Sequence, residues 1–172
     1  MIDSLDARAK SEISLTVNGE RKTVLALPME RLLDVLRQQL ELTGAKEGCA
    51  EGECGSCSVL MEGTLVNSCL VPILQAQGAN VVTIEGLAAG AQLHALQEAF
   101  LERGGAQCGI CTPGMILAAF HLLSKKPGPT LEEIQEGLSG NLCRCTGYVQ
   151  IFEAVVTAAH CRTSLSRGPN EI

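Results

Sequence analysis

The nine residues "CAEGECGSC" (49–57) hold three cysteines and two glycines. They place Cys49, Cys54 and Cys57 in the spacing C-x4-C-x2-C, and Cys69 follows after eleven further residues. Glycine adopts backbone angles that other residues avoid, so a short glycine-rich loop can bend sharply and bring several thiols to one point. We therefore predict that these four cysteines bind a metal centre.

The spacing of this first set is typical of plant-type [2Fe–2S] ferredoxins. A two-iron cluster needs two thiolates for each iron, and one tight loop supplies three of the four while a more distant residue supplies the last. Backbone N–H groups that point at the sulfurs would offset the negative charge of the cluster. Zinc is the alternative, but four-cysteine zinc sites usually combine two paired C-x2-C knuckles. The pattern favours iron–sulfur.

The residues around this loop predict a small α+β domain. Asn18-Gly19 lies in the middle of the alternating stretch 13–27, a combination that favours a tight hairpin turn. A second hairpin, over 58–68, turns at Glu62-Gly63, and a last strand covers 79–87. Between the hairpins we expect a helix that starts after Pro28, ends at Gly44 and packs through one apolar face, made of Leu32, Leu33, Leu36 and Leu40.

After about residue 88 the pattern predicts only helices, four of them and all short. The first covers 93–103 and stops at Gly104-Gly105. Thr112 would cap the second, with Pro113 at its first position. Thr130 and Glu133 form a capping box for the third, and the fourth covers 148–160. The expected inward faces are Met115, Ile116, Ala119, Leu122 and Leu123, then Leu131, Ile134 and Leu138, then Val149, Phe152 and Val156.

A second set of four cysteines belongs to this helical half. Cys108 and Cys111 are separated by two residues in "QCGICTPG" (107–114), and Cys143 and Cys145 by one residue in "GNLCRCTGY" (140–148). Cys108 and Cys111 precede a predicted helix, whose N-terminal dipole favours anionic sulfur. Two pairs from two loops can enclose one centre. Alone this pattern is compatible with zinc; beside the ferredoxin-type loop it favours a second cluster.

Composition narrows the classes of function. The chain has 172 residues, a hydrophobic fraction of 46% and a net charge of -6, which argues for packed domains and against nucleic acid as a partner. No apolar stretch reaches the roughly 18 residues that a membrane span needs. Because the first residues lack a secretory pattern, we expect a cytoplasmic protein, in which nine cysteines would not form disulfides.

Together, "CAEGECGSC", "QCGICTPGM" and "GNLCRCTGY" resemble the iron–sulfur subunit of the molybdenum hydroxylases, the xanthine oxidase family. The resemblance covers residues 12–160 and includes all eight cysteines of the two sets. It is strongest to the separate small subunit of bacterial three-subunit enzymes. It implies an α+β fold in which an N-terminal β-grasp, plant-type ferredoxin-like domain precedes an all-α four-helix bundle domain, each with one [2Fe–2S] cluster.

The resemblance also implies partners. A large subunit would hold the molybdenum–pterin cofactor and a medium subunit would hold FAD, so the chain would be the electron-transfer part of an oxidoreductase. The cluster of the helical domain would lie nearer the pterin, which Gln107 and Cys145 would approach. The substrate site would lie on another chain. The alternative is a free-standing two-cluster ferredoxin, although a simple carrier needs no helical domain.

These expectations divide the chain into a mobile extension (1–11), a ferredoxin-like domain (12–87), a helical domain (88–162) and a C-terminal tail (163–172). Cys161, the ninth cysteine, lies outside both sets. It follows His160 directly, and adjacent residues on a helix point in different directions, so we expect no metal ligand there.

Overall fold

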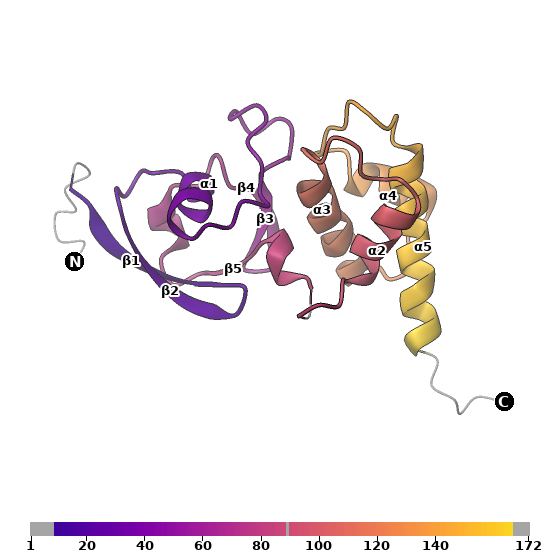
Figure 1. The fold of residues 1–172 in the computed structure, drawn as a ribbon, viewed down its shortest axis with the longest axis horizontal. Coiled ribbons are helices and arrows are strands. Elements are labelled where there is room, and N and C mark those ends of the chain that lie inside the picture. Colours follow the sequence, from indigo (N-terminus) through magenta and orange to yellow (C-terminus); the bar gives the residue numbers. More distant parts are fainter. Residues whose placement is uncertain (1–8, 89, 167–172) are drawn as a thin grey trace.

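The computed structural model describes residues 9–88 and 90–166, and for residues 161–166 it describes the backbone only. It has two parts, an N-terminal part built around a sheet and a C-terminal part built from helices (Figure 1). The two are joined by a chain segment that passes beside the sheet before α2 begins. The first eight and last six residues, which include most of the predicted extension and tail, lie outside the described residues.

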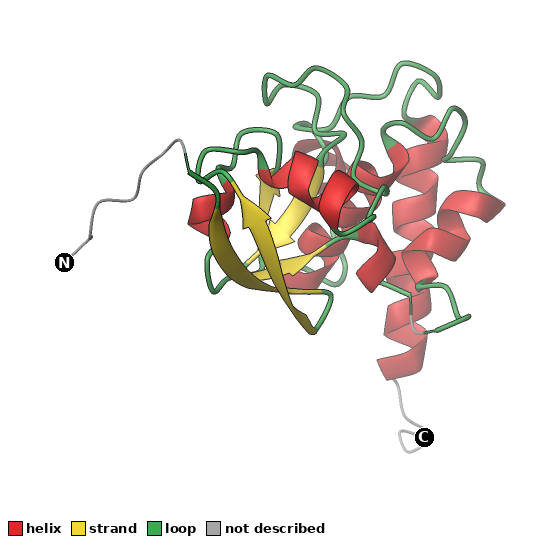
Figure 2. Cartoon of the chain, turned by 60° about the vertical axis from the view of Figure 1, so that its left-hand side comes forward, coloured by secondary structure: helices red, strands yellow, loops and turns green. Residues whose placement is uncertain are grey.

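The sheet has five strands in the order β2-β1-β5-β3-β4. Their bounds are β1 Ser11–Val17, β2 Glu20–Ala26, β3 Ser58–Met61, β4 Thr64–Asn67 and β5 Asn80–Val82. The central strand β5 pairs parallel with β1 and antiparallel with β3, while both hairpins are antiparallel. Figure 2 shows the strands as one curved layer with short helices on one side. This arrangement confirms the ferredoxin-like, β-grasp character of the first part.

Both predicted hairpin turns are confirmed. Asn18 and Gly19 have φ angles of 52° and 83°, and Glu62 and Gly63 have φ angles of 50° and 72°. Two successive residues with positive φ make the turn whose twist matches that of antiparallel strands. The predicted last strand is shorter than 79–87, because the 3-10 turn η3 (Ile84–Gly86) follows β5.

The prediction of a helix that ends at Gly44 is wrong in both the length and the type of the helix. α1 covers only Leu32–Asp34 and continues as a π-helical turn, η1 (Val35–Gln39). It ends there because Glu41 has a φ of 57°, which no right-handed helix accommodates. Its predicted apolar face is nevertheless largely correct: Leu32, Leu33 and Leu36 are buried and Leu40 is partly buried. A further 3-10 helix, η2 (Ile73–Ala76), was not predicted.

The second part is helical, as predicted. After α1 in the first part, the described residues hold α2 (Ala95–Glu102), α3 (Thr112–Lys125), α4 (Leu131–Gly137) and α5 (Val149–Ser166). α5 packs against α2 and α4, and α3 packs against α2, α4 and the strands β3 and β4. α3 is therefore the helix through which the two parts meet, as Figure 1 shows.

Helix caps agree with the sequence at one site and differ at another. At α4, Thr130 Oγ1 accepts from the Glu133 N–H at 3.3 Å and Glu133 accepts from the Thr130 N–H at 2.8 Å, so the predicted capping box is confirmed. At α3, the capping position is Cys111, and the Thr112 hydroxyl is buried without a hydrogen-bond partner in the described part of the chain. The predicted cap by Thr112 is therefore wrong.

The face that α5 turns inward differs from the prediction. Its buried residues are Ile151, Ala154, Val155, Ala158 and Ala159. Val149 is 59% exposed, and Phe152 and Val156 are only partly buried. Leu131, predicted to face inward from α4, is 54% exposed. α5 also extends to Ser166, past residue 162, where we placed the end of the helical domain.

None of the described helices is long and apolar enough to cross a bilayer.

Candidate functional site

The first set of cysteines lies at the edge of the sheet, on both sides of β3 and β4. Cys49, Cys54 and Cys57 occupy the loop that leads into β3, and Cys69 follows the end of β4. Cys57 and Cys69 are buried, and the charge of Cys69 acts on the Cys57 thiol. The charge of Cys54 also acts on Cys57. The hairpin thus carries the distant cysteine back to the three cysteines of the loop.

The loop surrounds Cys49 with backbone donors. The N–H groups of Glu51, Glu53 and Cys54 each donate to Cys49 Sγ at 3.4 Å. These bonds, led by the one from Glu51, lower the pKa of the Cys49 thiol to about 7. Donors arranged in this way stabilise a thiolate, which is the form that binds a metal. Burial has the opposite effect on Cys57 and raises its pKa to about 11.

Two glycines of this loop are required for different reasons. Gly52 has a φ of 79°, and a Cβ there would come within 2.2 Å of Leu70 Cδ1. Gly48 has no unusual φ, but a Cβ there would come within 2.8 Å of Cys54 Sγ. Gly55 also has a positive φ, of 67°. Gly44 and Gly48 instead leave room for neighbouring side chains.

The second set comes together from two loops of the helical part. Cys108 and Cys111 precede α3, and Cys143 and Cys145 lie between α4 and α5. The charges of Cys108 and Cys143 act on both Cys111 and Cys145. The four thiols therefore form one contiguous group, with Cys111 buried and with Cys108 and Cys145 exposed.

The thiols of this group differ in their electrostatic environment. Burial raises the pKa of Cys111 to about 12. At Cys143, burial acts in the same direction, but hydrogen bonds with Thr146 outweigh it and lower the pKa below its usual value. Thr146 Oγ1 lies 3.2 Å from Cys143 Sγ. Tyr148, with a φ of 71°, accepts from the Cys143 N–H at 3.0 Å through its hydroxyl and so fixes the loop.

Both groups suit a two-iron cluster. The eight cysteines of the two sets are all free thiols, and each group offers four of them. A [2Fe–2S] core takes four thiolates, two on each iron, which is the number that each group offers. When bound, such clusters supply one-electron redox chemistry.

Gln107, predicted to approach a pterin, is exposed and directly precedes Cys108. Exposed Cys108 and Cys145 lie together, so Gln107 and Cys145 occupy the same accessible end of the helical part. The side chain of Cys161 lies outside the described residues.

Sequence reasoning missed the residues that join the two groups. The Leu142 N–H donates to the carbonyl of Cys54 at 2.9 Å, which links a loop of the helical part to the loop of the first set. Next to it, Asn141 is buried and donates to the Gly55 carbonyl at 2.8 Å. A signal was present, because Asn141 stands directly before the "LCRC" run. Sequence alone did not indicate where its side chain would bind.

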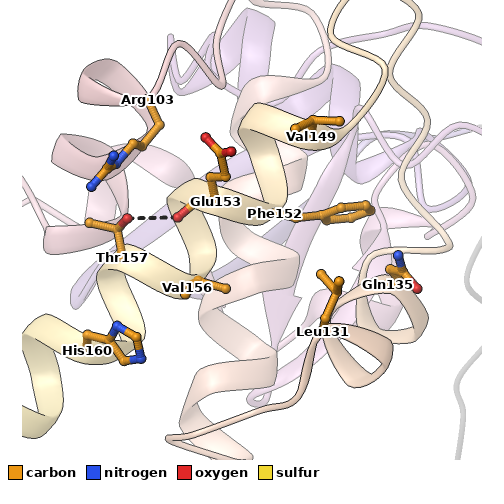
Figure 3. Close-up of a pocket in the computed structure, with 9 residues that line it drawn as sticks. All are labelled: Arg103, Leu131, Gln135, Val149, Phe152, Glu153, Val156, Thr157 and His160. Carbon is orange, nitrogen blue, oxygen red and sulfur yellow. Dashed lines mark hydrogen bonds between the residues drawn. The ribbon is translucent and has the colours of Figure 1, made fainter.

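A groove of about 640 Å³ runs along the outer side of α5. Val149, Phe152 and Val156, the residues predicted to face inward, line it together with Leu131 (Figure 3). Thr157 in its wall donates to the Glu153 carbonyl at 2.8 Å, as the dashed line in Figure 3 shows. None of the eight cysteines of the two thiol groups is among the described residues that line the groove, so it is separate from both groups.

Comparison with known proteins agrees with this geometry. Residues 15–81 match a family described as a 2Fe-2S iron-sulfur cluster binding domain, and residues 83–156 match a [2Fe-2S] binding domain. The nicotinate dehydrogenase small FeS subunit of Eubacterium barkeri is 51% identical over 146 residues, which are 85% of this chain and 93% of the relative. The nicotine 6-hydroxylase small subunit of Paenarthrobacter nicotinovorans is 50% identical over 86% of this chain and 88% of its own length.

Comparison of the fold with solved structures gives a related enzyme. A chain of quinoline 2-oxidoreductase from Pseudomonas putida 86 superposes with a TM-score of 0.87 at 41% identity, over 90% of this chain and 97% of the other. Two [2Fe-2S]-binding domains in succession define an iron–sulfur electron-transfer protein. The chain belongs to the family of small iron–sulfur subunits of the molybdenum hydroxylases.

Proposed function

We propose that the chain carries two [2Fe–2S] clusters and passes electrons from a molybdenum–pterin centre on a large partner subunit to a flavin subunit or another acceptor. Cys49, Cys54, Cys57 and Cys69 would hold one cluster, and Cys108, Cys111, Cys143 and Cys145 the other. The observation that carries the proposal is the presence of two groups of four free thiols in two domains of [2Fe-2S]-binding families.

The residues around the thiols have defined roles in this function. The backbone N–H groups that donate to Cys49 Sγ, and the Thr146 hydroxyl beside Cys143 Sγ, favour thiolates. They would also offset the charge that an added electron brings. Cys57, Cys69 and Cys111 are buried, so water would have little access to these thiolates when a cluster is bound. Hydrogen bonding, burial and charge are the means by which a protein sets the potential of such centres.

We further infer the domain limits and the partner surface. The cluster-binding units are residues 12–87 and 88–162, with α2, α3, α4 and α5 acting as a four-helix bundle. The accessible end with Gln107 and Cys145 also exposes Ile110 (46%) and Leu142 (54%). An apolar surface beside two exposed thiols is suited to cover by a partner, and we assign it to the molybdenum–pterin subunit.

The decisive experiment is an assay of iron and acid-labile sulfide in the purified chain. We expect about four irons and about four sulfides per chain, because each cluster has two of each. About two irons, or tightly bound zinc, would contradict the two-cluster function.

A free-standing two-cluster carrier remains the second candidate, since the same thiols would serve it. Gel filtration of the protein from its native host separates the two. A free carrier elutes as the lone chain, whereas the small chain of a larger enzyme elutes together with molybdenum and a bigger polypeptide.

A further inference from the structure

The two parts of the chain are in close contact at Gly55, Gly114, Gly140 and Asn141. We call this contact the joint. A Cβ on Gly114 would come within 2.2 Å of the Gly55 carbonyl oxygen. A Cβ on Gly55 would come within 2.4 Å of the Gly140 carbonyl oxygen. Three backbone segments, from the first cysteine loop, the first turn of α3 and the loop after α4, are therefore in direct contact. Only glycine permits this approach.

Asn141 fastens this joint. The residue is 2% exposed, and Nδ2 donates across the domain boundary to the Gly55 carbonyl at 2.8 Å and to Ser58 Oγ at 3.3 Å. The Gly55 carbonyl also accepts from the Ser58 N–H at 3.1 Å, within its own part, so the Asn141 bond is the one that links this carbonyl to the helical part. Asn141 therefore stabilises the observed arrangement of the two parts relative to other arrangements.

Each bond of the joint lies beside a cysteine of a predicted cluster site. Gly55 follows Cys54, and Leu142, whose N–H donates to the Cys54 carbonyl at 2.9 Å, precedes Cys143. A shift at the joint would therefore move one thiol group relative to the other. Electron tunnelling slows steeply as the separation of two redox centres grows, so this spacing matters to a protein that transfers electrons between them.

We propose that Asn141 is a positioning residue for electron transfer, because it sets the distance and orientation between the two four-cysteine sites. The proposal rests on the proposed function, since it requires both clusters. The step it controls transfers one electron: the reduced cluster is oxidised and the oxidised cluster is reduced, with no bond formed or broken. Asn141 is not one of the eight cysteines that would hold the clusters, and its side chain donates to Gly55 and Ser58.

Electron paramagnetic resonance of the fully reduced holoprotein measures the spacing directly. Two paramagnetic clusters at close range split each other's signals through a dipolar coupling that falls with the cube of their distance. In Asn141→Asp and Asn141→Ala we expect iron content equal to wild type, both cluster signals present, and the splitting reduced or lost. The transfer rate between the clusters, followed after rapid partial reduction, should fall with it.

Asn67→Asp is the matched control. Asn67 Nδ2 donates to the Gly52 carbonyl at 2.6 Å, so it binds the same cysteine loop through the same chemistry but from within the first part. We expect this variant to alter the signal of the first cluster and to keep the splitting. Unchanged splitting in the Asn141 variants, or equal loss in Asn67→Asp, would overturn the proposal. Wild-type protein with fewer than four irons would instead overturn the proposed function.

Two further measurements apply if the Asn141 variants fail to assemble clusters. Gly114→Ala forces a Cβ against the Gly55 carbonyl and removes no thiolate and no hydrogen-bond donor, so we expect the same loss of splitting. In unaltered holoprotein, the Leu142 amide hydrogen should exchange with solvent much more slowly than that of exposed Gln107. Exchange at the same rate would overturn the proposal.

Discussion

At the scale of single residues, the cysteines divide into the eight that we propose as cluster ligands and Cys161, which lies outside both motifs. Eight thiols complete two groups of four, and Cys161 belongs to neither motif. Cys161→Ser should therefore keep the iron content and the visible absorption spectrum of the unaltered protein. Cys57→Ser, which removes a buried thiol from the first group, is the control that should lose iron. Loss of a cluster signal in Cys161→Ser would show that the ligand assignment is wrong.

The prediction for Gln107 concerns electron transfer to the clusters and not the assembly of the clusters. Its exposed amide offers both a donor and an acceptor beside exposed Cys108, as a contact with a pterin edge requires. In the complex, Gln107→Ala should slow cluster reduction by substrate in a single turnover, while reduction by dithionite stays normal.

The control for this variant is Gln75→Ala, which changes an exposed glutamine of the first part. It should leave both rates unchanged. If substrate reduces the clusters of Gln107→Ala at the unaltered rate, the contact with the pterin either does not form or does not affect transfer.

At the scale of secondary structure elements, α4 is short enough that its cap decides its stability. Thr130 and Glu133 satisfy two backbone N–H groups at its start, and Glu133 also pairs with Lys126. We expect Thr130→Ala to lower the free energy of unfolding by about 1 kcal/mol. Thr130→Ser keeps the hydroxyl and should stay close to the unaltered value. Urea unfolding of the three proteins at one pH measures the difference, and equal midpoints would contradict it.

The pH dependence of this cap follows from Glu133. The hydrogen bond with Lys126, and then that with the Thr130 N–H, lower the pKa of Glu133 from its ordinary value. A lowered folded-state pKa stabilises the protein at pH values above the unfolded pKa, and this contribution is lost as the pH falls through the folded one. The loss of stability in Glu133→Gln should therefore be larger at neutral pH than in acid, as urea unfolding at the two pH values measures.

At the scale of the whole molecule, the sequence predicted what is local and missed what depends on packing. The hairpin turns, the cysteine loop and the Thr130 cap were predicted correctly because neighbouring residues determine each of them. The end of α1, the inward face of α5 and the contact of Asn141 were not. The last two depend on which distant segment lies against them: apolar residues of α5 occur on more than one face, and only the packed helices α2 and α4 determine which is buried. The end of α1 depends on the positive φ of Glu41, which the residue type did not indicate.

The largest prediction concerns the assembly. The exposed residues Ile110 and Leu142 lie at the end with the accessible thiols, and a partner that covers them would bury apolar surface next to the second cluster. We expect the chain to co-purify with a large subunit that contains molybdenum. Ile110→Glu should weaken this complex in gel filtration, because it places a charge in an apolar contact while leaving all eight thiols in place.

Leu25→Glu is the matched control for Ile110→Glu. Leu25 is 54% exposed, a similar fraction, but it lies on β2, the edge strand farthest in the sheet from β3 and β4, which contact α3. Leu25→Glu should keep the molybdenum subunit bound, and both variants should keep their iron. Equal retention of molybdenum in the two variants would show that the partner binds elsewhere. A lone, molybdenum-free chain from the native host would favour the free carrier instead.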